Sequence, residues 1–227
     1  MITAWGRCTG SRSRICRSSM RQNETTGAPV RSEPKLGNAC ACRPSRNAAE
    51  LLSVAAFLEG RHAQAFPSFG SERTGAPVVS FCRIDDRQIR LREPVQRPHA
   101  VIIADPTVVH QVDVLAGLRP EGYLLVNSSK SFAELGLDDV AARLPDGHAA
   151  LVPATALAQE HVGRPVPNAG LLGGFAAMSG LMSLAAVRQA IEERFPARIA
   201  SGNITAARAA YDLVTVQWGR TLGASHA

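Results

Sequence analysis

The chain has 227 residues, of which 45% are hydrophobic and 19% charged, and its formal net charge is +6. This is the composition of an ordinary soluble globular protein, and no apolar run approaches the roughly 18 residues that a membrane-spanning helix needs. The N-terminus also lacks the apolar segment of a secretory signal. The sequence therefore predicts a cytoplasmic protein with no membrane partner.

Residues 1–47 differ in composition from the rest of the chain. They carry nine Lys or Arg and two Asp or Glu, a net of +7, and four of the five cysteines. The remaining residues carry sixteen Lys or Arg and seventeen Asp or Glu, a net charge of −1. We therefore expect no basic stripe for nucleic acid on the folded body. Cys40-Ala-Cys42 resembles half of a zinc site, but no second pair stands at ligand spacing, and we predict no metal site.

The same N-terminal segment predicts little stable structure, because its apolar residues are sparse and unperiodic. A helix is predicted to follow it, capped by Asn47, running through Glu59 and closed by Gly60. The apolar residues of this helix recur at helical spacing and indicate a core-facing stripe: Leu51, Leu52, Ala55 and Leu58.

A polar loop is predicted between this helix and the next strand. Gly70 and Gly75 bracket a Ser-Glu-Arg-Thr segment, and glycine at both ends permits a tight loop that presents the polar groups. The pattern then alternates like a strand over residues 78–84. Residues 88–91 are predicted to return as the hairpin partner of that strand.

Strands and helices alternate from residue 100 onward. Apolar runs typical of buried strands occur at residues 100–104, 123–126 and 149–152. Each run precedes a predicted helix, and these helices cover residues 105–116, 137–144 and 155–162. Repeated βα units of this kind predict an α/β domain with three α/β/α layers and a mainly parallel or mixed sheet.

Polar residues follow the three runs: Asp105 and Thr107, Asn127 and Ser128, and Thr155. Parallel strands place these ends along one edge of the sheet, where open α/β sheets usually bind ligands. The alternative, that Asp105 and Thr155 only cap helices, is equally compatible with the sequence.

The final third of the chain is helical. A small, apolar helix is predicted from Asn168 to about Leu181, a second is capped by Ser183, and a third is capped by Asn203. Their apolar stripes indicate core or subunit interface. No phosphate-binding loop, dinucleotide fingerprint or nucleophile elbow occurs, so the sequence predicts no catalytic residue and no self-contained active site.

Several segments form a recognisable set: Ala48-Ala-Glu-Leu-Leu52, Ala65-Phe-Pro-Ser-Phe-Gly-Ser-Glu-Arg-Thr-Gly-Ala-Pro-Val78, Asp105-Pro-Thr107, His110-Gln111, and Val166-Pro-Asn-Ala169 with Leu172-Gly-Gly174. Together they resemble the gamma subunit of pyruvate:ferredoxin oxidoreductases, over roughly residues 48–218. The match in the fourteen-residue loop is specific. It favours the pyruvate or branched 2-oxoacid branch over relatives that act on 2-oxoglutarate.

The resemblance implies oxidative decarboxylation of a 2-oxoacid to an acyl-CoA, with electrons passed to ferredoxin. It implies alpha, beta and delta-type partner subunits in a hetero-oligomer. Thiamine diphosphate, Mg²⁺ and iron–sulfur clusters are expected on those partners, with coenzyme A as co-substrate and none of these groups held by this chain alone. The loop residues expected to face the coenzyme A pocket or a partner subunit are Ser68, Ser71, Glu72, Arg73 and Thr74.

The chain departs from the family at its N-terminus. The family begins with a strand and a Gly-Arg-Gly-Gly-Gln-Gly loop shortly before the Ala-Glu-Leu-Leu helix, whereas here Gly6-Arg7 is followed by an unrelated sequence. We therefore expect the first strand and the glycine loop to be lost, with residues 1–47 a non-family segment, 48–218 the gamma-type domain and 219–227 a tail. A shifted reading frame upstream of residue 48 would explain why the sequence changes there from non-family to family-like. It predicts a poorly soluble or inactive chain.

Two other classes remain open from the sequence. The chain could be a stand-alone, non-catalytic α/β module that binds a small molecule or another protein. It could also be a nucleic-acid binder with a basic tail, although the neutral body argues against this.

Overall fold

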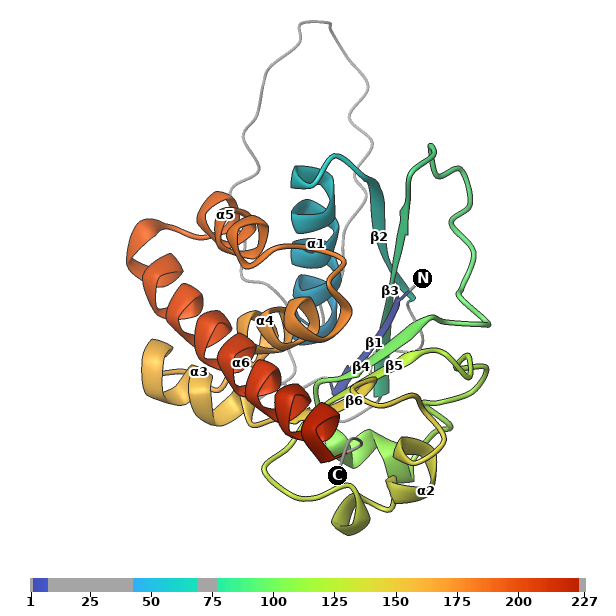
Figure 1. The fold of residues 1–227 in the computed structure, drawn as a ribbon. Helices are drawn as coiled ribbons and strands as arrows, with labels where there is room; N and C mark the ends of the chain where they lie inside the picture. Colours follow the sequence, from blue (N-terminus) through green and yellow to red (C-terminus); the bar gives the residue numbers. More distant parts are fainter. Residues whose placement is uncertain (1, 8–42, 69–76, 225–227) are drawn as a thin grey trace, which may run out of the picture.

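The computed structural model describes residues 2–7, 43–68 and 77–224. Its centre is a six-stranded sheet in the order β2-β3-β1-β4-β5-β6 (Figure 1). The strands are β1 (Ile2–Arg7), β2 (His62–Ser68), β3 (Pro77–Asp85), β4 (Ala100–Ile103), β5 (Tyr123–Asn127) and β6 (Ala149–Val152). β1, β4, β5 and β6 run parallel, while β2 and β3 form an antiparallel pair at one side. The predicted α/β class with a mixed sheet is confirmed.

The prediction that the first strand is lost is wrong. β1 lies in the middle of the sheet, antiparallel to β3 with Ile2 opposite Cys82, and parallel to β4 with Ile2 opposite Ala100. Its partners β3 and β4 are distant from it in sequence. Little stable structure was also predicted for residues 43–47, but helix α1 (Arg43–Leu58) includes them. Residues 8–42 lie outside the described ranges.

The predicted hairpin partner of β3 is also wrong. β3 pairs with β2 on one side, with His62 opposite Asp85, and with β1 on the other. Both edges of β3 are therefore occupied, and the chain after Asp85 is irregular. The Arg83 guanidinium there donates to the Glu93 carbonyl at 2.9 Å. The polar loop of residues 69–76 thus connects two strands of one hairpin.

Long helices cover one face of the sheet: α1, α3 (Ala154–Val162), α4 (Asn168–Ser179), α5 (Leu184–Arg194) and α6 (Ala197–Ala224) (Figure 1). The other face is covered by shorter turns: η1 (Pro106–His110), η2 (Ala133–Leu135) and α2 (Asp138–Ala141). The sheet is therefore enclosed on both faces, although η1 and α2 are shorter than the helices predicted there.

Alternate residues of the parallel strands enter two separate cores. Ile102 and Leu125 face α1 and α4, while Val101 and Leu124 face the shorter turns on the opposite side. This burial on both faces explains why these strands appear in the sequence as continuous apolar runs.

Several helix ends match the sequence and two do not. The predicted cap Asn47 lies inside α1, which begins at Arg43. Gly60 adopts a φ of 79° after α1, as its predicted role requires, and the Ser183 hydroxyl accepts from the Ala186 N–H at the start of α5. Asn203 is not a cap. It lies inside α6, is buried, and donates to the Ile199 carbonyl at 2.8 Å. The helix α6 runs from Ala197 to Ala224.

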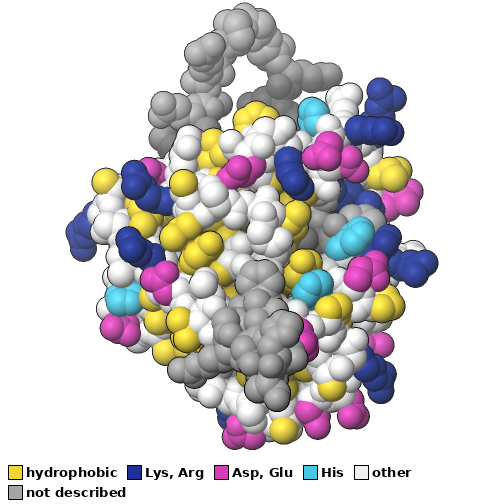
Figure 2. All heavy atoms as spheres, viewed as in Figure 1, with side chains coloured by type: hydrophobic (Ala, Val, Ile, Leu, Met, Phe, Trp, Pro, Cys, Tyr) yellow, Lys and Arg dark blue, Asp and Glu magenta, His cyan; other side chains and the backbone are white. Residues whose placement is uncertain are grey.

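In the described part of the chain, none of the helices is long and apolar enough to cross a membrane. Positively and negatively charged side chains are interspersed on the face shown in Figure 2.

Candidate functional site

An open groove lies at the carboxyl ends of the parallel strands β4, β5 and β6. Its walls come from η1, from the segment after β5 and from the first turn of α3. The residues that line it include Thr107, His110, Asn127, Ser128, Ser129, Lys130, Glu134, Thr155 and Gln159. The sequence located the groove through Asn127, Ser128 and Thr155, since the ends of parallel strands meet at one edge.

Asn127 forms the floor of the groove and joins three elements. Its Nδ2 donates to the Ala104 carbonyl and to the Thr155 hydroxyl, both at 2.7 Å, and its Oδ1 accepts from the Thr155 N–H at 3.1 Å. The side chain is buried, and all of these bonds are made within the protein. Asn127 therefore sets the shape of the groove, and the Thr155 hydroxyl proton remains available to a ligand.

Asp105 acts as a cap, which was one of the two alternatives left open by the sequence. One of its carboxylate oxygens accepts from the Thr107 N–H at 2.9 Å and from the Thr107 hydroxyl at 2.6 Å. These bonds close the first turn of η1. Thr107 still lines the groove, but Asp105 does not.

The ionisable groups of the groove are a lysine, a glutamate and a histidine. The Glu134 carboxylate accepts from the Ser131 N–H and the Ser131 hydroxyl, both at 2.8 Å, which forms a capping box with η2. Both bonds lower the pKa of Glu134, and the bond from the Ser131 N–H has the larger effect. Glu134 is therefore a fixed carboxylate. Lys130 and His110 are the exposed groups able to meet a negative ligand.

The groove offers hydrogen-bond donors and an exposed lysine, but no pairing of a nucleophile with a base is seen among its described residues. Likewise, no group of three or more His, Cys, Asp or Glu that could hold a metal occurs within the described ranges. Its chemistry is that of binding a polar or anionic molecule. Ser129, Lys130 and Gln159 were not predicted as site residues, although the Ser-Ser-Lys run directly after β5 was a usable signal.

The predicted loop site is described only at its two ends. Arg7, at the end of β1, pairs with Pro77, at the start of β3, so Pro77 lies at the edge of the sheet where β1 ends. Ser68 is the last residue of β2 and pairs with Val79. Ser71, Glu72, Arg73 and Thr74 lie outside the described residues, and their predicted role stays a prediction.

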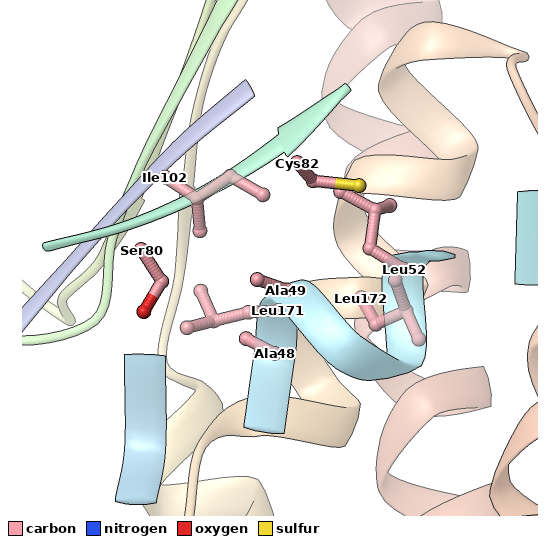
Figure 3. Close-up of a pocket in the computed structure, with 8 residues that line it drawn as sticks. All are labelled: Ala48, Ala49, Leu52, Ser80, Cys82, Ile102, Leu171 and Leu172. Carbon is pink, nitrogen blue, oxygen red and sulfur yellow. The ribbon is translucent and has the colours of Figure 1, made fainter. Parts of the chain in front are cut away.

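A small apolar cavity lies between the sheet, α1 and α4 (Figure 3). It is lined by Ala48, Ala49, Leu52, Ser80, Cys82, Ile102, Leu171 and Leu172. Burial raises the pKa of the Cys82 thiol to about 12, so this group is a neutral thiol and not a nucleophile at physiological pH. The cavity is therefore part of the core and not a reaction site.

Comparison with known proteins identifies the family. The model of the pyruvate ferredoxin/flavodoxin oxidoreductase family matches residues 45–213. The chain belongs to this family. The family resemblance seen in the sequence is thereby confirmed.

Named members of the family are similar over most of the chain. A protein of Pyrococcus furiosus named pyruvate/ketoisovalerate oxidoreductases common subunit gamma is 41% identical over 169 residues, covering 74% of this chain and 90% of that protein. The pyruvate synthase subunit PorC of Methanothermobacter marburgensis is 41% identical over 165 residues, covering 73% of this chain and 88% of that protein.

A solved structure of this family has the same fold. The crystal structure of pyruvate oxidoreductase subunit PORC from Thermotoga maritima superposes with a TM-score of 0.65 at 27% identity, covering 93% of this chain and 94% of that chain. A 2-oxoglutarate:ferredoxin oxidoreductase from Magnetococcus marinus shares the fold at 12% identity and a TM-score of 0.56, covering 77% of this chain and 28% of that one.

Proposed function

We propose that this chain is the gamma subunit of a 2-oxoacid:ferredoxin oxidoreductase. The complex would decarboxylate pyruvate or a branched 2-oxoacid, release CO₂, pass two electrons to ferredoxin and transfer the acyl group to coenzyme A. The observation that carries this proposal is the 41% identity, over 74% of the chain, to a subunit named for pyruvate and ketoisovalerate.

The proposal assigns the redox chemistry to other subunits. Cys82 is the single cysteine within residues 2–7, 43–68 and 77–224, and it is buried. The described residues therefore do not fit an iron–sulfur cluster, which needs several thiolates. We assign thiamine diphosphate, Mg²⁺ and the clusters to alpha, beta and delta-type partners in a cytoplasmic hetero-oligomer.

In this scheme the chain contributes binding surface at one edge of its sheet. Ser68, Ser71, Glu72, Arg73 and Thr74 would face the coenzyme A pocket or a partner subunit. An arginine there suits a phosphate or a partner carboxylate, because its planar guanidinium donates two parallel hydrogen bonds, and Glu72 would orient it.

Reconstitution tests the proposal. The tagged chain is co-expressed with candidate alpha, beta and delta subunits, purified through the tag, and assayed for viologen or ferredoxin reduction that depends on pyruvate and coenzyme A. Reduction that requires this chain is the expected result. If the partners do not co-purify and the subunits are equally active without it, the proposal fails.

The second candidate is a non-catalytic α/β module that binds a small molecule or another protein. The open polar groove favours it, because none of the described groove residues pairs a nucleophile with a base. A stable monomer that never co-purifies with oxidoreductase subunits would support this function.

The hypothesis of a shifted reading frame is tested separately, by sequencing the coding DNA before residue 48. The hypothesis requires that an alternative frame there encodes Gly-Gly-Gln-Gly.

A further inference from the structure

A long irregular segment connects β3 to β4. The chain between Asp85 and Ala100 contains no helix or strand, whereas most connections in compact domains have about 4–6 residues. Structureless connections longer than about 12 residues are uncommon and are usually functional. Figure 1 shows this segment beside β3, on the side away from α1. We call its residues 86–97 the arm.

The arm is fixed to the face of the β2–β3 hairpin opposite α1. Cys82 lies in the core that packs with α1, so strand alternation turns its neighbour Arg83 to the other face, together with Gln64, which pairs with Arg83 across the two strands. The Arg83 guanidinium donates to the Glu93 carbonyl at 2.9 Å. The Gln64 amide is satisfied with its oxygen toward the arm, where it accepts from the Arg92 guanidinium at 2.7 Å.

The end of the arm is held as well. Val95 is buried, and the Gln96 carbonyl packs so closely against Gly117 that an added Cβ there would overlap it. Just beyond the arm, the Pro98 carbonyl accepts from the Arg119 N–H at 3.2 Å. The arm is therefore a preformed surface, and a partner that binds it does not have to order a flexible loop.

The outer side of the arm is basic and carries one large apolar side chain. Four of the sixteen Lys and Arg of residues 48–227 lie in the twelve residues of the arm, together with two acidic residues. Arg87, Arg90 and Arg97 are exposed, and none of them forms an ion pair within the described ranges. Leu91, directly after Arg90, is 57% exposed. These side chains are all free to meet a partner.

This combination fits an acidic protein surface. Guanidinium groups on a fixed backbone bind carboxylates through two parallel hydrogen bonds. Arginine beside an apolar anchor is typical of the energetically dominant part of a protein–protein interface. Nucleic acid fits less well, because Asp86 and Glu93 interrupt the positive charge and the arm has no aromatic residue on which a base could stack.

We propose that the arm docks an acidic protein surface with an apolar pocket that receives Leu91, and that Arg87 and Arg90 pair with carboxylates around that pocket. In the oxidoreductase complex the surface belongs to a partner subunit, and this identity rests on the proposed function. The arm enters β4 at its amino end, whereas the polar groove lies at the carboxyl ends of β4, β5 and β6. Docking at the arm therefore leaves the groove open to a ligand.

The test measures binding of the full chain to the purified alpha, beta and delta-type partner subunits by biolayer interferometry, at low and at high NaCl concentration. The double substitution Arg87→Glu and Arg90→Glu should weaken binding at least about 10-fold at low salt and remove most of the salt dependence, because charge complementarity is lost. Leu91→Ser should weaken binding about 10-fold at both salt concentrations, because an apolar anchor is lost.

Matched controls change the same chemistry elsewhere on the surface. Arg188→Glu with Arg208→Glu reverses two exposed arginines of α5 and α6, and Val216→Ser truncates an apolar side chain that is 54% exposed. Both controls should bind as the natural chain does. Unchanged binding in either arm variant, or equal losses in the controls, would overturn the arm proposal and leave the proposed function in place. A natural chain that binds none of the partner subunits would overturn both.

Discussion

Asn127, the last residue of β5, and Thr155, in the first turn of α3, bond each other in both directions. The Asn127 Nδ2 donates to the Thr155 hydroxyl at 2.7 Å, and the Thr155 N–H donates to the Asn127 Oδ1 at 3.1 Å. One side chain thereby caps α3 and ties the ends of two strands, which makes the floor of the groove rigid.

Substitution of Asn127 by Leu should destabilise the fold by about 2 kcal/mol, because the Ala104 carbonyl and the Thr155 N–H lose their partner in a buried place. Urea unfolding monitored by circular dichroism measures the change. Thr155→Ser is the matched control, since it keeps the hydroxyl and should cost less than about 1 kcal/mol. Equal losses for the two variants would show that the bonds of Asn127 are not what fixes this corner.

Much of the sheet could be predicted because its parallel strands are buried on both faces and appear as apolar runs. The polar edge could also be predicted, since Asn127 and Thr155 directly follow two of those runs. β1 could not, because what identifies it is pairing with β3 and β4, which are distant in sequence. The partner of β3 was misassigned for a related reason: the neighbouring segment is close in sequence, but both edges of β3 are already occupied.

Some site features depend on burial, which no short motif encodes. The unpaired amide of Asn168 is an example, because its sequence context shows only an asparagine before an apolar helix. Asn203 is another. Asparagine is typical of helix caps, but here tertiary packing places it inside a longer helix.

Glu59, after α1, is fixed by the start of α5. Its carboxylate accepts from the Ser183 hydroxyl at 2.6 Å and from the Ser183 N–H at 2.9 Å, and these two bonds lower its pKa from the ordinary value of 4.5. A lowered pKa means that the carboxylate stabilises the fold above pH 4.5 and that this contribution is lost as the pH falls through the folded-state pKa.

We therefore expect Glu59→Gln to lower the free energy of unfolding at pH 7 by no more than about 1 kcal/mol, because the group is exposed to solvent. The difference from the natural chain should shrink below pH 4.5. Denaturant unfolding at a series of pH values tests this. Glu193→Gln on α5 removes an exposed carboxylate whose bond is to Gln189 of the same helix, and it should change little. A pH-independent loss in Glu59→Gln would contradict the assignment.

Cys82 should resist alkylation in the folded chain. Burial raises its pKa to about 12, so the reactive thiolate is scarce at pH 8. Because this pKa is raised, the neutral thiol stabilises the fold fully below the ordinary value of 9.0, and that contribution is lost as the pH rises toward 12. Iodoacetamide treatment followed by mass spectrometry of the peptide that contains Cys82 measures the effect, with the urea-unfolded chain as the reactive control. Rapid native labelling of this peptide would be inconsistent with the structure.

Gly173 allows α4 and α6 to touch through their backbones. A Cβ at this position would lie 2.0 Å from the Ala207 carbonyl oxygen, a distance that no real contact tolerates. Gly173→Ala should therefore cost more than about 3 kcal/mol or prevent folding. Gly136→Ala is the control for a glycine substitution. Its φ is 67° but nothing lies within 4 Å, so only backbone strain of about 1 kcal/mol is expected. Similar losses in the two variants would count against close helix packing.

Arg73 gives the sharpest test of the proposed role of the loop. In the assembled complex, Arg73→Ala should raise the KM for coenzyme A on the order of 10-fold or lower 2-oxoacid turnover, because a charge-assisted bidentate contact is lost. Arg73→Lys keeps the charge but not the paired donors, so it should recover only part of the effect. Arg188→Ala, an exposed arginine of α5 paired with Glu192 at 3.1 Å, controls for loss of a surface charge. Unchanged steady-state kinetics for both substrates in Arg73→Ala would remove the loop from the coenzyme A pocket. Loss of subunit co-purification in the same variant would instead place Arg73 at a subunit interface.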